Sequence, residues 1–408
     1  MKCRHCGQSV TLPFCDLGTA PPSNAYLRAD QLDAPERHYP LRVKVCGHCW
    51  LAQTQDFAGA GELFDAEYGY FSSTSSSWLA HAKAYVEQMA QRFGLGPQSH
   101  VVEVAANDGY LLRHVQALGV PCTGIEPTAS TAAAARALGL NIVEEFFGTA
   151  LANQLVEQGR AANLMAANNV LAHVPDINDF VAGFARLLKP TGVATFEFPQ
   201  LLNLVRFHQF DTLYHEHFSY LSLTAVRRIF QANGLQVFDV EELPTHGGSL
   251  RVYAQRSDTA PHAVAATVAR QLRAEGDAGI ETPAFYAGLQ AAAEDIKHAL
   301  LRFLLDARRD NLKVAAYGAA AKGNTLLNFA GVRPDLLPYV VDRSPGKVGR
   351  YLPGSRIPIV TEDHLRADRP DRILILPWNI AQEVTGQLAY AREWGARFVK
   401  AVPSLEVW

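Results

Sequence analysis

The amino-acid sequence predicts an α/β protein in which a small cysteine-rich domain precedes two larger domains built on parallel β-sheets. Five of the six cysteines lie within the first 49 residues, and alternating strand-like and helix-like segments occupy most of the remaining chain. The length of 408 residues exceeds one ordinary domain, so two or three domains of roughly 100 to 200 residues each are expected. A hydrophobic fraction of 48% and a charged fraction of 19% are typical of a globular protein with well-buried cores.

The cysteine-rich domain is predicted from two C-x2-C pairs, Cys3 with Cys6 and Cys46 with Cys49. Two such pairs about 40 residues apart can bring four thiolates around one tetrahedral Zn²⁺. Because four sulfur ligands leave no open coordination position, the ion would be structural and remote from any reaction. The alternatives are four unrelated thiols or a redox-active C-x-x-C pair.

The middle domain is predicted from "HVVEVAANDGYLLRHVQALGV", residues 100–120, which reads as an apolar strand, a turn of small residues and a helix. The next short apolar strand, in "PCTGIEP", ends in Glu126, and a second helix-like segment follows it. Repeated strand–helix–strand units indicate a parallel sheet whose ligands bind at the carboxyl ends of the strands.

The residues at those strand ends indicate an adenosyl ligand. An acidic residue that ends the second strand, here Glu126, can accept hydrogen bonds from both hydroxyls of a ribose. The first turn contains Asn107, Asp108 and a single glycine, Gly109, so it lacks the G-x-G-x-x-G fingerprint of dinucleotide-binding turns. A pyrophosphate would fit poorly there, which favours a ligand without phosphates such as S-adenosylmethionine. The alternative is that Glu126 is a solvated loop acid.

Residues 214–220, "YHEHFSY", place two histidines, a glutamate and two tyrosines within one short stretch. Histidine is the side chain whose ordinary pKa suits proton transfer near neutral pH. The alternative is a polar turn that precedes the helix expected in "SLTAVRRIF", residues 222–230.

The C-terminal domain is predicted from an amphipathic helix over residues 292–311, followed by "KVAAYGAAAKGNTLLNFAG", which reads as strand, small-residue loop and helix. The loop directs main-chain N–H groups and Lys322 toward a common point, which is typical of an anion-binding site. Lys322 precedes Gly323 instead of following it, so this is not a Walker A sequence and nucleotide hydrolysis is not implied.

Seven stretches together carry a resemblance to a known family: the cysteine pairs, "VVEVAANDGYLL", "NNVLAHVPD", "FDTLYHEHFSYLSL", "HGGSLRVY", "YGAAAKGNTLLN" and "VVDRSPGKVGRYLPG". The chain resembles, over essentially its whole length, the three-part sugar C-methyltransferases that methylate nucleotide-linked 4-keto-deoxysugars in deoxysugar and antibiotic biosynthesis. The resemblance implies a zinc-binding domain over residues 1–68, a Rossmann-like class I methyltransferase domain over 69–254, and a Rossmann-like C-terminal domain over 255–408.

Methylation of a carbon next to a ketone needs a base for the C–H proton, a group that stabilises the enolate, and a methyl group held in line. The family's Tyr-x-Glu-His pattern falls on Tyr214, Glu216 and His217. The resemblance makes His217 the base, Tyr214 a hydroxyl near the keto oxygen, and Glu216 an orienting residue. His215 stands at the variable position and is expected to face outward, whereas His173 is expected to face the same cleft.

The resemblance also implies further contacts. It places the cofactor contacts on Glu103, Asn107, Asp108, Gly109, Glu126, Asn168 and Asn169. The expected substrate contacts are Lys322, Asn324, Arg343, His246 and Arg251. The diphosphate of a sugar nucleotide, expected to be dTDP-linked, would occupy the basic, loop-rich rim that contains Lys322, Arg343, Lys347 and Arg350. The alternatives are solvated charges at this rim, and an ordinary turn and strand at His246 and Arg251.

Charge and hydropathy exclude other classes of partner. The formal net charge of −3 provides no basic field for nucleic acid or for an anionic membrane. No run approaches about 18 apolar residues, and no apolar stretch follows the N-terminus, so a cytoplasmic protein without a signal peptide is expected. No protein partner is implied. Two other functions remain open, an NAD-dependent oxidoreductase or epimerase of a sugar nucleotide and a non-catalytic zinc-containing interaction protein.

Overall fold

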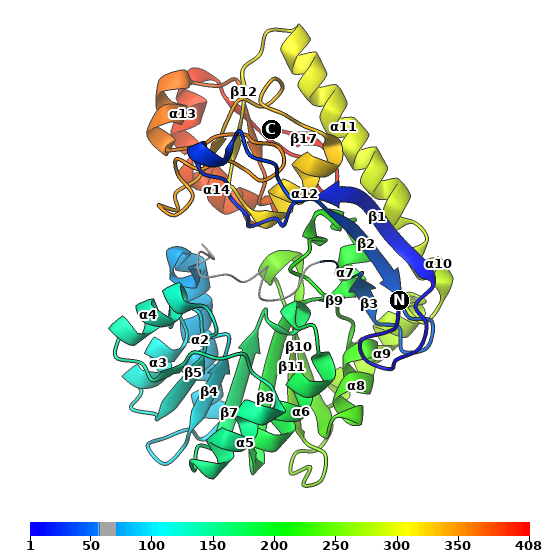
Figure 1. Ribbon diagram of the computed structural model, residues 1–408, viewed down its shortest axis with the longest axis vertical. Helices are drawn as coiled ribbons and strands as arrows, with labels where there is room; N and C mark the ends of the chain where they lie inside the picture. Colours follow the sequence, from blue (N-terminus) through cyan, green and yellow to red (C-terminus); the bar gives the residue numbers. More distant parts are fainter. Residues whose placement is uncertain (56, 58–70) are drawn as a thin grey trace.

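The structure, a computed structural model, describes residues 1–55, 57 and 71–408, and within these residues the strands form three sheets (Figure 1). The first is an antiparallel sheet with the strand order β1-β2-β3-β9. Its strands are β1 (Leu12–Ala20), β2 (Tyr39–Val45), β3 (Ala52–Thr54) and β9 (Ser219–Tyr220). Strand β9 ends the "YHEHFSY" segment, so this segment completes a sheet that begins near the N-terminus. The expected domain boundary between residues 68 and 69 lies outside the described residues.

The second sheet has the strand order β10-β11-β8-β7-β4-β5-β6, and over the described residues all its strands are parallel except β11. The strands are β4 (Val101–Val104), β5 (Cys122–Ile125), β6 (Ile142–Val143), β7 (Ala162–Asn168), β8 (Leu188–Pro199), β10 (Leu235–Leu243) and β11 (Ser249–Arg256). The helices are α2 (Ser76–Phe93), α3 (Leu112–Ala117), α4 (Ala129–Ala137), α5 (Thr149–Glu157), α6 (Ile177–Leu187), α7 (Leu201–Arg206), α8 (Leu223–Ala232) and α9 (Ala266–Asp277). This arrangement confirms the predicted class I methyltransferase fold of the middle part.

The third sheet has the strand order β14-β13-β12-β15-β16-β17 and is parallel except for β17 within the part of the chain that the structure describes. Its strands are β12 (Val314–Tyr317), β13 (Val340–Val341), β14 (Ile359–Val360), β15 (Arg372–Ile375), β16 (Arg397–Lys400) and β17 (Glu406–Val407). The helices are α10 (Pro283–Tyr286), α11 (Leu289–Arg309), α12 (Ala321–Ala330), α13 (Glu362–Asp368) and α14 (Ala381–Gln387). The predicted Rossmann-like character of this part is confirmed. The boundary expected between residues 254 and 255 falls within β11, which belongs to the second sheet.

Seven short 3-10 helices connect these elements in the described residues, and several of them carry site residues. They are η1 (Ala29–Gln31), η2 (Ser72–Thr74), η3 (Leu171–His173), η4 (Phe210–Thr212), η5 (Thr245–Gly247), η6 (Trp378–Ile380) and η7 (Ala389–Trp394).

The three parts share hydrophobic cores. One core joins β2, α11 and β12 through Val43, Leu300 and Val314. Figure 1 shows the connection between β1 and β2 running beside the C-terminal part, where the hydroxyl of Tyr26 donates a 2.6 Å hydrogen bond to the carbonyl of Ala319. The N-terminal part therefore bridges the other two sheets.

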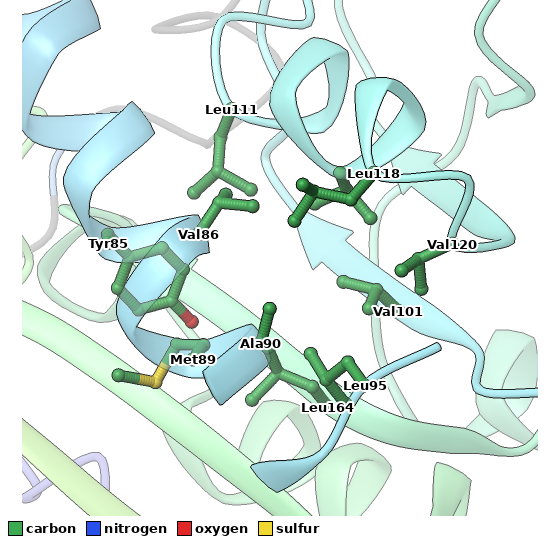
Figure 2. A pocket seen from close by; sticks show the side chains of 11 residues that line it. Tyr85, Val86, Met89, Ala90, Leu95, Val101, Leu111, Leu118, Val120 and Leu164 are labelled. Carbon is green, nitrogen blue, oxygen red and sulfur yellow. The ribbon is translucent and has the colours of Figure 1, made fainter. Parts of the chain in front are cut away.

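A small apolar pocket lies among α2, α3 and β4, and Figure 2 shows the side chains that line it. The hydroxyl of Tyr85 is engaged with Thr195 Oγ1 at 2.6 Å, and the other lining side chains are apolar. The pocket therefore belongs to the core of the middle part. None of the helices in the described ranges is long and apolar enough to cross a membrane.

Candidate active site

The 210–220 loop carries the "YHEHFSY" residues and is held by the N-terminal sheet. It begins in η4 and ends in β9, which pairs with β3. The Oγ1 hydroxyl of Thr54, the last residue of β3, donates a 3.1 Å hydrogen bond to the carbonyl of His217. The main chain at the predicted base is therefore tied to the zinc-binding part, whose zinc ion was expected to be remote from the reaction.

The structure brings the two predicted histidines together. The ring centroids of His173 and His217 lie 4.6 Å apart. His217 Nδ1 donates to the carbonyl of Thr212 at 3.1 Å, and His173 Nδ1 donates to the carbonyl of Glu216 at 2.8 Å. Because a carbonyl only accepts, each neutral ring carries its lone pair on Nε2. Burial lowers the pKa of His173 to about 4 and the pKa of His217 well below its ordinary value, so both rings are neutral near pH 7.

Tyr214 and Glu216 complete this cluster. The ring centroid of Tyr214 lies 4.0 Å from that of His217. Glu216 is 1% exposed, and its Oε1 accepts hydrogen bonds from the main-chain N–H and the side-chain amide of Asn24, both at 3.1 Å. Burial raises the pKa of the Glu216 carboxyl. Glu216 thus ties the 210–220 loop to the connection between β1 and β2, which gives its expected orienting role a physical basis.

His215 does not face outward, and that expectation was wrong. The residue is only 8% exposed, and its Nε2 lies 3.1 Å from the carbonyl of Tyr39 on β2. The two rings also meet edge to face, with centroids 6.1 Å apart. The N-terminal sheet covers this side of the loop, a long-range contact that the motif pattern does not reveal.

The predicted cofactor residue Glu126 follows β5 with its carboxylate held in place. Its Oε2 accepts from the N–H of Asn107 and its Oε1 from the N–H of Thr128, each at 2.9 Å. Each oxygen keeps a second lone pair that could accept from a ribose hydroxyl. Gly109 in the same turn has a φ of 79°, and a Cβ there would lie 2.4 Å from Leu140 Cδ1, so the turn requires glycine.

Glu103, Asp108 and Glu126 form an acidic cluster near the ends of β4 and β5. Burial raises the pKa of Glu103 well above its usual range, and the charges of Glu126 and Asp108 add to this effect. Asp108 accepts a 3.0 Å hydrogen bond from the N–H of Ser73 through Oδ2, while its buried Oδ1 has no hydrogen-bond partner among the described residues. Asp108 and Glu126 fit S-adenosylmethionine, whose sulfonium and ammonium groups are positive, and these two acids would repel the phosphates of a dinucleotide.

Asn168 and Asn169 lie where β7 ends, and here the predicted cofactor and substrate residues meet. Asn169 Nδ2 lies 3.1 Å from Nε2 of His246, and both residues have a positive φ of 55°. The ring of His246 lies 5.3 Å from Trp78, which stacks on Tyr110 at 5.9 Å. Burial lowers the pKa of His246 to about 4, so this histidine is also neutral near pH 7.

Arg251 lies in an ion-pair network of the second sheet. Its guanidinium lies 3.0 Å from Glu197 and 3.1 Å from Glu241, and its side chain is 3% exposed. Glu197 also lies 2.9 Å from His81 Nε2 and accepts a 3.0 Å hydrogen bond from Thr245 Oγ1, which precedes His246. The sequence analysis did not identify Glu197 as a site residue, although a charged residue inside the apolar stretch "VATFEF" is a signal for a buried ion pair.

The three predicted substrate residues of the C-terminal part have different surroundings. Asn324 is 1% exposed and donates a 2.7 Å hydrogen bond to the carbonyl of Ser23. Arg343 is half-exposed and pairs with Glu362 at 2.9 Å. The ammonium of Lys322 donates a 2.6 Å hydrogen bond to Oδ1 of Asn379 in η6, and its charge lowers the pKa of Asp211 in the 210–220 loop. The structure therefore groups Lys322 with the 210–220 loop, and it leaves Arg343 at the surface.

Two residues that sequence reasoning missed join the middle and C-terminal parts. Asp211 is fully buried, and its Oδ2 accepts a 2.7 Å hydrogen bond from Nε1 of Trp378. Asp211 stands beside the "YHEHFSY" motif, and an acid between the apolar residues Phe210 and Leu213 is a usable signal. Trp378 lies 167 residues later and carries no local signal.

The four predicted zinc ligands are gathered at one point. The Sγ atoms of Cys3, Cys6, Cys46 and Cys49 all lie within 4.8 Å of one another, with the Cys3–Cys49 pair at 3.5 Å and the Cys6–Cys46 pair at 3.6 Å. Zn–S bonds of about 2.3 Å place the sulfurs of a tetrahedral site about 3.8 Å apart. The cluster therefore fits one structural Zn²⁺, as predicted.

Family models match three consecutive segments of the chain. A zinc-binding domain model matches residues 3–64, a methyltransferase domain model matches 78–240, and a C-methyltransferase C-terminal domain model matches 244–403. The C-methyltransferase NovU of Streptomyces niveus is 32% identical over 406 residues, which cover 100% of this chain and 96% of that protein.

Solved structures resemble only part of the chain. The magnesium protoporphyrin IX methyltransferase of Synechocystis PCC 6803 with bound S-adenosylmethionine is 14% identical, covers 44% of this chain and 79% of its own, and has a TM-score of 0.33. The PH0226 protein of Pyrococcus horikoshii OT3 is 12% identical, covers 50% of this chain and 100% of its own, and has a TM-score of 0.39. The full-length similarity to NovU and the three matched segments are what assign the family. The chain belongs to the three-domain family of S-adenosylmethionine-dependent C-methyltransferases that its sequence motifs resemble.

Proposed function

We propose that this C-methyltransferase methylates the carbon next to the ketone of a nucleotide-linked 4-keto-deoxysugar, with C3 as the methylated carbon and His217 as the base. The observation that carries the proposal is the neutral pair of His173 and His217 beside Tyr214. A C–H bond next to a ketone is acidic because the enolate places its charge on oxygen. The site therefore needs a neutral base and a donor to that oxygen, and His217 and Tyr214 can supply them.

In the proposed reaction, Nε2 of His217 takes the proton from C3. The C–H electron pair forms the C3–C4 double bond of the enolate, and the negative charge moves to the ketone oxygen. The hydroxyl of Tyr214 donates a hydrogen bond to the enolate oxygen, and the carbon then forms its bond to the methyl group. S-adenosylmethionine, when bound, supplies that methyl group from its sulfonium and leaves as S-adenosylhomocysteine. The carbonyl of Thr212 keeps the proton on Nδ1 of His217, so that Nε2 remains the basic atom.

We propose that the sugar nucleotide, dTDP-linked by family resemblance, extends from this site onto the C-terminal part. The ammonium of Lys347, which donates a 2.8 Å hydrogen bond to the carbonyl of Ala319, is the positive group that we propose to contact the diphosphate. Asn324, Arg343 and His246 remain proposed substrate contacts. We also propose that the three domains span residues 1–68, 69–254 and 255–408. We propose that the reaction takes place in the cytoplasm.

Mass spectrometry of products tests this function. The protein is incubated with S-adenosylmethionine and a panel of nucleotide sugars that share the nucleotide but differ in whether C4 carries a ketone or a hydroxyl. Only the ketosugars should gain one methyl group, and fragmentation should place it on C3. Methylation of the 4-hydroxy sugars at the same rate, or on oxygen, would refute the proposal.

A further inference from the structure

Asp211 and Trp378 form a buried contact between the two larger parts of the molecule. Asp211 belongs to η4 in the middle part and Trp378 to η6 in the C-terminal part, and the indole N–H donates to the carboxylate at 2.7 Å. The second oxygen of Asp211 is buried without a hydrogen-bond partner among the described residues. Burial raises the pKa of Asp211 to about 6, and the charge of Lys322 opposes this rise, so Asp211 is mostly a carboxylate near neutral pH.

Lys322 supplies a positive charge beside this contact. Its Nζ lies 4.5 Å from the centroid of the Trp378 ring and donates a 2.6 Å hydrogen bond to Oδ1 of Asn379. The ring face attracts the ammonium, and the amide oxygen fixes its direction. The side chain of Lys322 is therefore committed to η6 and to the interface with the middle part.

Two contacts hold the neighbours of Lys322 against the loops that carry the candidate site. Thr325, one turn later on α12, donates a 2.9 Å hydrogen bond to the carbonyl of Leu213, the residue before Tyr214. The Trp378 ring packs so closely on Gly247 that a Cβ at this glycine would lie 2.6 Å from a ring carbon. Gly247 follows His246. Burial is the main cause of the lowered pKa values of His217 and His246, and the charge of Lys322 contributes to both.

We propose that Lys322 is a further catalytic residue, whose ammonium pairs with the substrate oxygen that becomes negative when His217 removes the C3 proton. This inference rests on the proposed function. A neutral ketone can approach Lys322 at little cost, and the attraction grows only as charge develops, which is the condition for lowering a barrier. A diphosphate at this point would instead place permanent negative charge beside the buried Asp211. Asp211 and Trp378 act as positioning residues for Lys322.

The test compares Lys322→Met with Lys297→Met. Lys297 is a matched control because its ammonium also lies over an aromatic ring, 4.6 Å from the centroid of Phe329. Calorimetry measures binding of dTDP alone and of S-adenosylmethionine, and mass spectrometry measures both methylation of the ketosugar nucleotide and deuterium exchange at C3. For Lys322→Met we expect unchanged affinity for dTDP and a loss of ~10²-fold or more in both exchange and turnover, the scale of removing one charge-stabilising donor. Lys297→Met should retain both rates.

Loss of dTDP affinity with full turnover at saturating substrate would make Lys322 a phosphate anchor and overturn the inference, as would an unchanged rate. A wild-type protein that neither exchanges nor methylates ketosugars would instead refute the proposed function. If Lys322→Met does not fold, Lys322→Ala with added ethylammonium provides a second readout. Recovery of exchange with the added cation supports the charge-pairing role, and an active Lys322→Ala enzyme without it contradicts this role. Trp378→Phe keeps an aromatic ring and removes the N–H, so it should lower kcat and leave the affinity for dTDP unchanged.

Discussion

The imidazoles of His173 and His217 meet edge to face with centroids 4.6 Å apart, and both direct Nδ1 to main-chain carbonyls of the 210–220 loop. A positive charge on one ring disfavours a charge on the other, so protonation of either lowers the pKa of its neighbour. Near neutral pH the pair is uncharged, and it can accept the single proton that the proposed reaction releases.

Replacement of the proposed base should separate binding from chemistry. His217→Asn should bind S-adenosylmethionine and the sugar nucleotide normally but lose ~10²-fold or more in turnover, the usual scale of general-base catalysis. Deuterium exchange at C3 should be suppressed together with methylation. His173→Asn is the comparison, because it removes the neighbouring imidazole. If His217→Asn remained near the wild-type rate while His173→Asn lost exchange and turnover, the assignment of the base would be reversed.

The value of kcat/KM should begin to fall only at an unusually low pH. His217 is active when neutral, so activity is lost as pH falls through its folded-state pKa, which burial, His173, His246 and Lys322 all lower. We expect kcat/KM to stay level from pH 8 to pH 7 and to decline only below about pH 6.5, the ordinary pKa of histidine. If the midpoint of the decline in kcat/KM lay above about pH 6.5, His217 would not be a buried neutral ring during catalysis.

Glu126→Ala should weaken binding of S-adenosylmethionine more than binding of the sugar nucleotide. Loss of a buried charged hydrogen bond costs about 1.5 to 3 kcal/mol, which corresponds to at least a tenfold rise in Kd. Calorimetric titration of each ligand measures the two effects separately. Glu144→Ala is a suitable control, since Glu144 lies on the surface in an ion pair with Arg136. Equal Kd values for S-adenosylmethionine in wild type and Glu126→Ala would remove Glu126 from the site.

Zinc should be required for the stability of the N-terminal part. Metal analysis should find about one zinc ion per chain, and Cys46→Ser should lower both zinc content and Tm, because the metal joins segments that are otherwise far apart in sequence. Cys15→Ser is the control, since Cys15 is buried but lies outside the cluster. Turnover should fall with zinc loss because Thr54 holds the carbonyl of His217. Full activity in protein without zinc would contradict both statements.

His215→Ala should destabilise the protein, although the family pattern alone would make it silent. The substitution removes a hydrogen bond to the carbonyl of Tyr39 and a ring that packs on β2. The free energy of unfolding should fall by about 1 to 3 kcal/mol in urea denaturation, while kcat changes little. His208→Ala, which removes a more exposed histidine of the same region, should change stability less.

Local patterns were sufficient wherever a residue's role depends on its immediate neighbours in the chain. The C-x2-C pairs predict zinc because two turns suffice to present four thiolates. The strand, turn and helix around Gly109 predict a cofactor loop because parallel strands end at one edge of a sheet. Helix α11 was predicted from its apolar spacing, because the residues that a helix buries recur along the sequence with the helical period.

The sequence by itself determined the order of the three parts, the metal ligands, the class I sheet and the motif that carries His217. Only the tertiary structure decided which side chains surround that motif. In the folded chain, His215 is buried against β2 and Arg251 forms an ion pair with Glu197. Lys322 and Trp378 lie beside Asp211. The physical reason is that these contacts join segments up to 176 residues apart, so they depend on how sheets and helices pack across the whole chain. Local propensity and spacing contain no information about such partners.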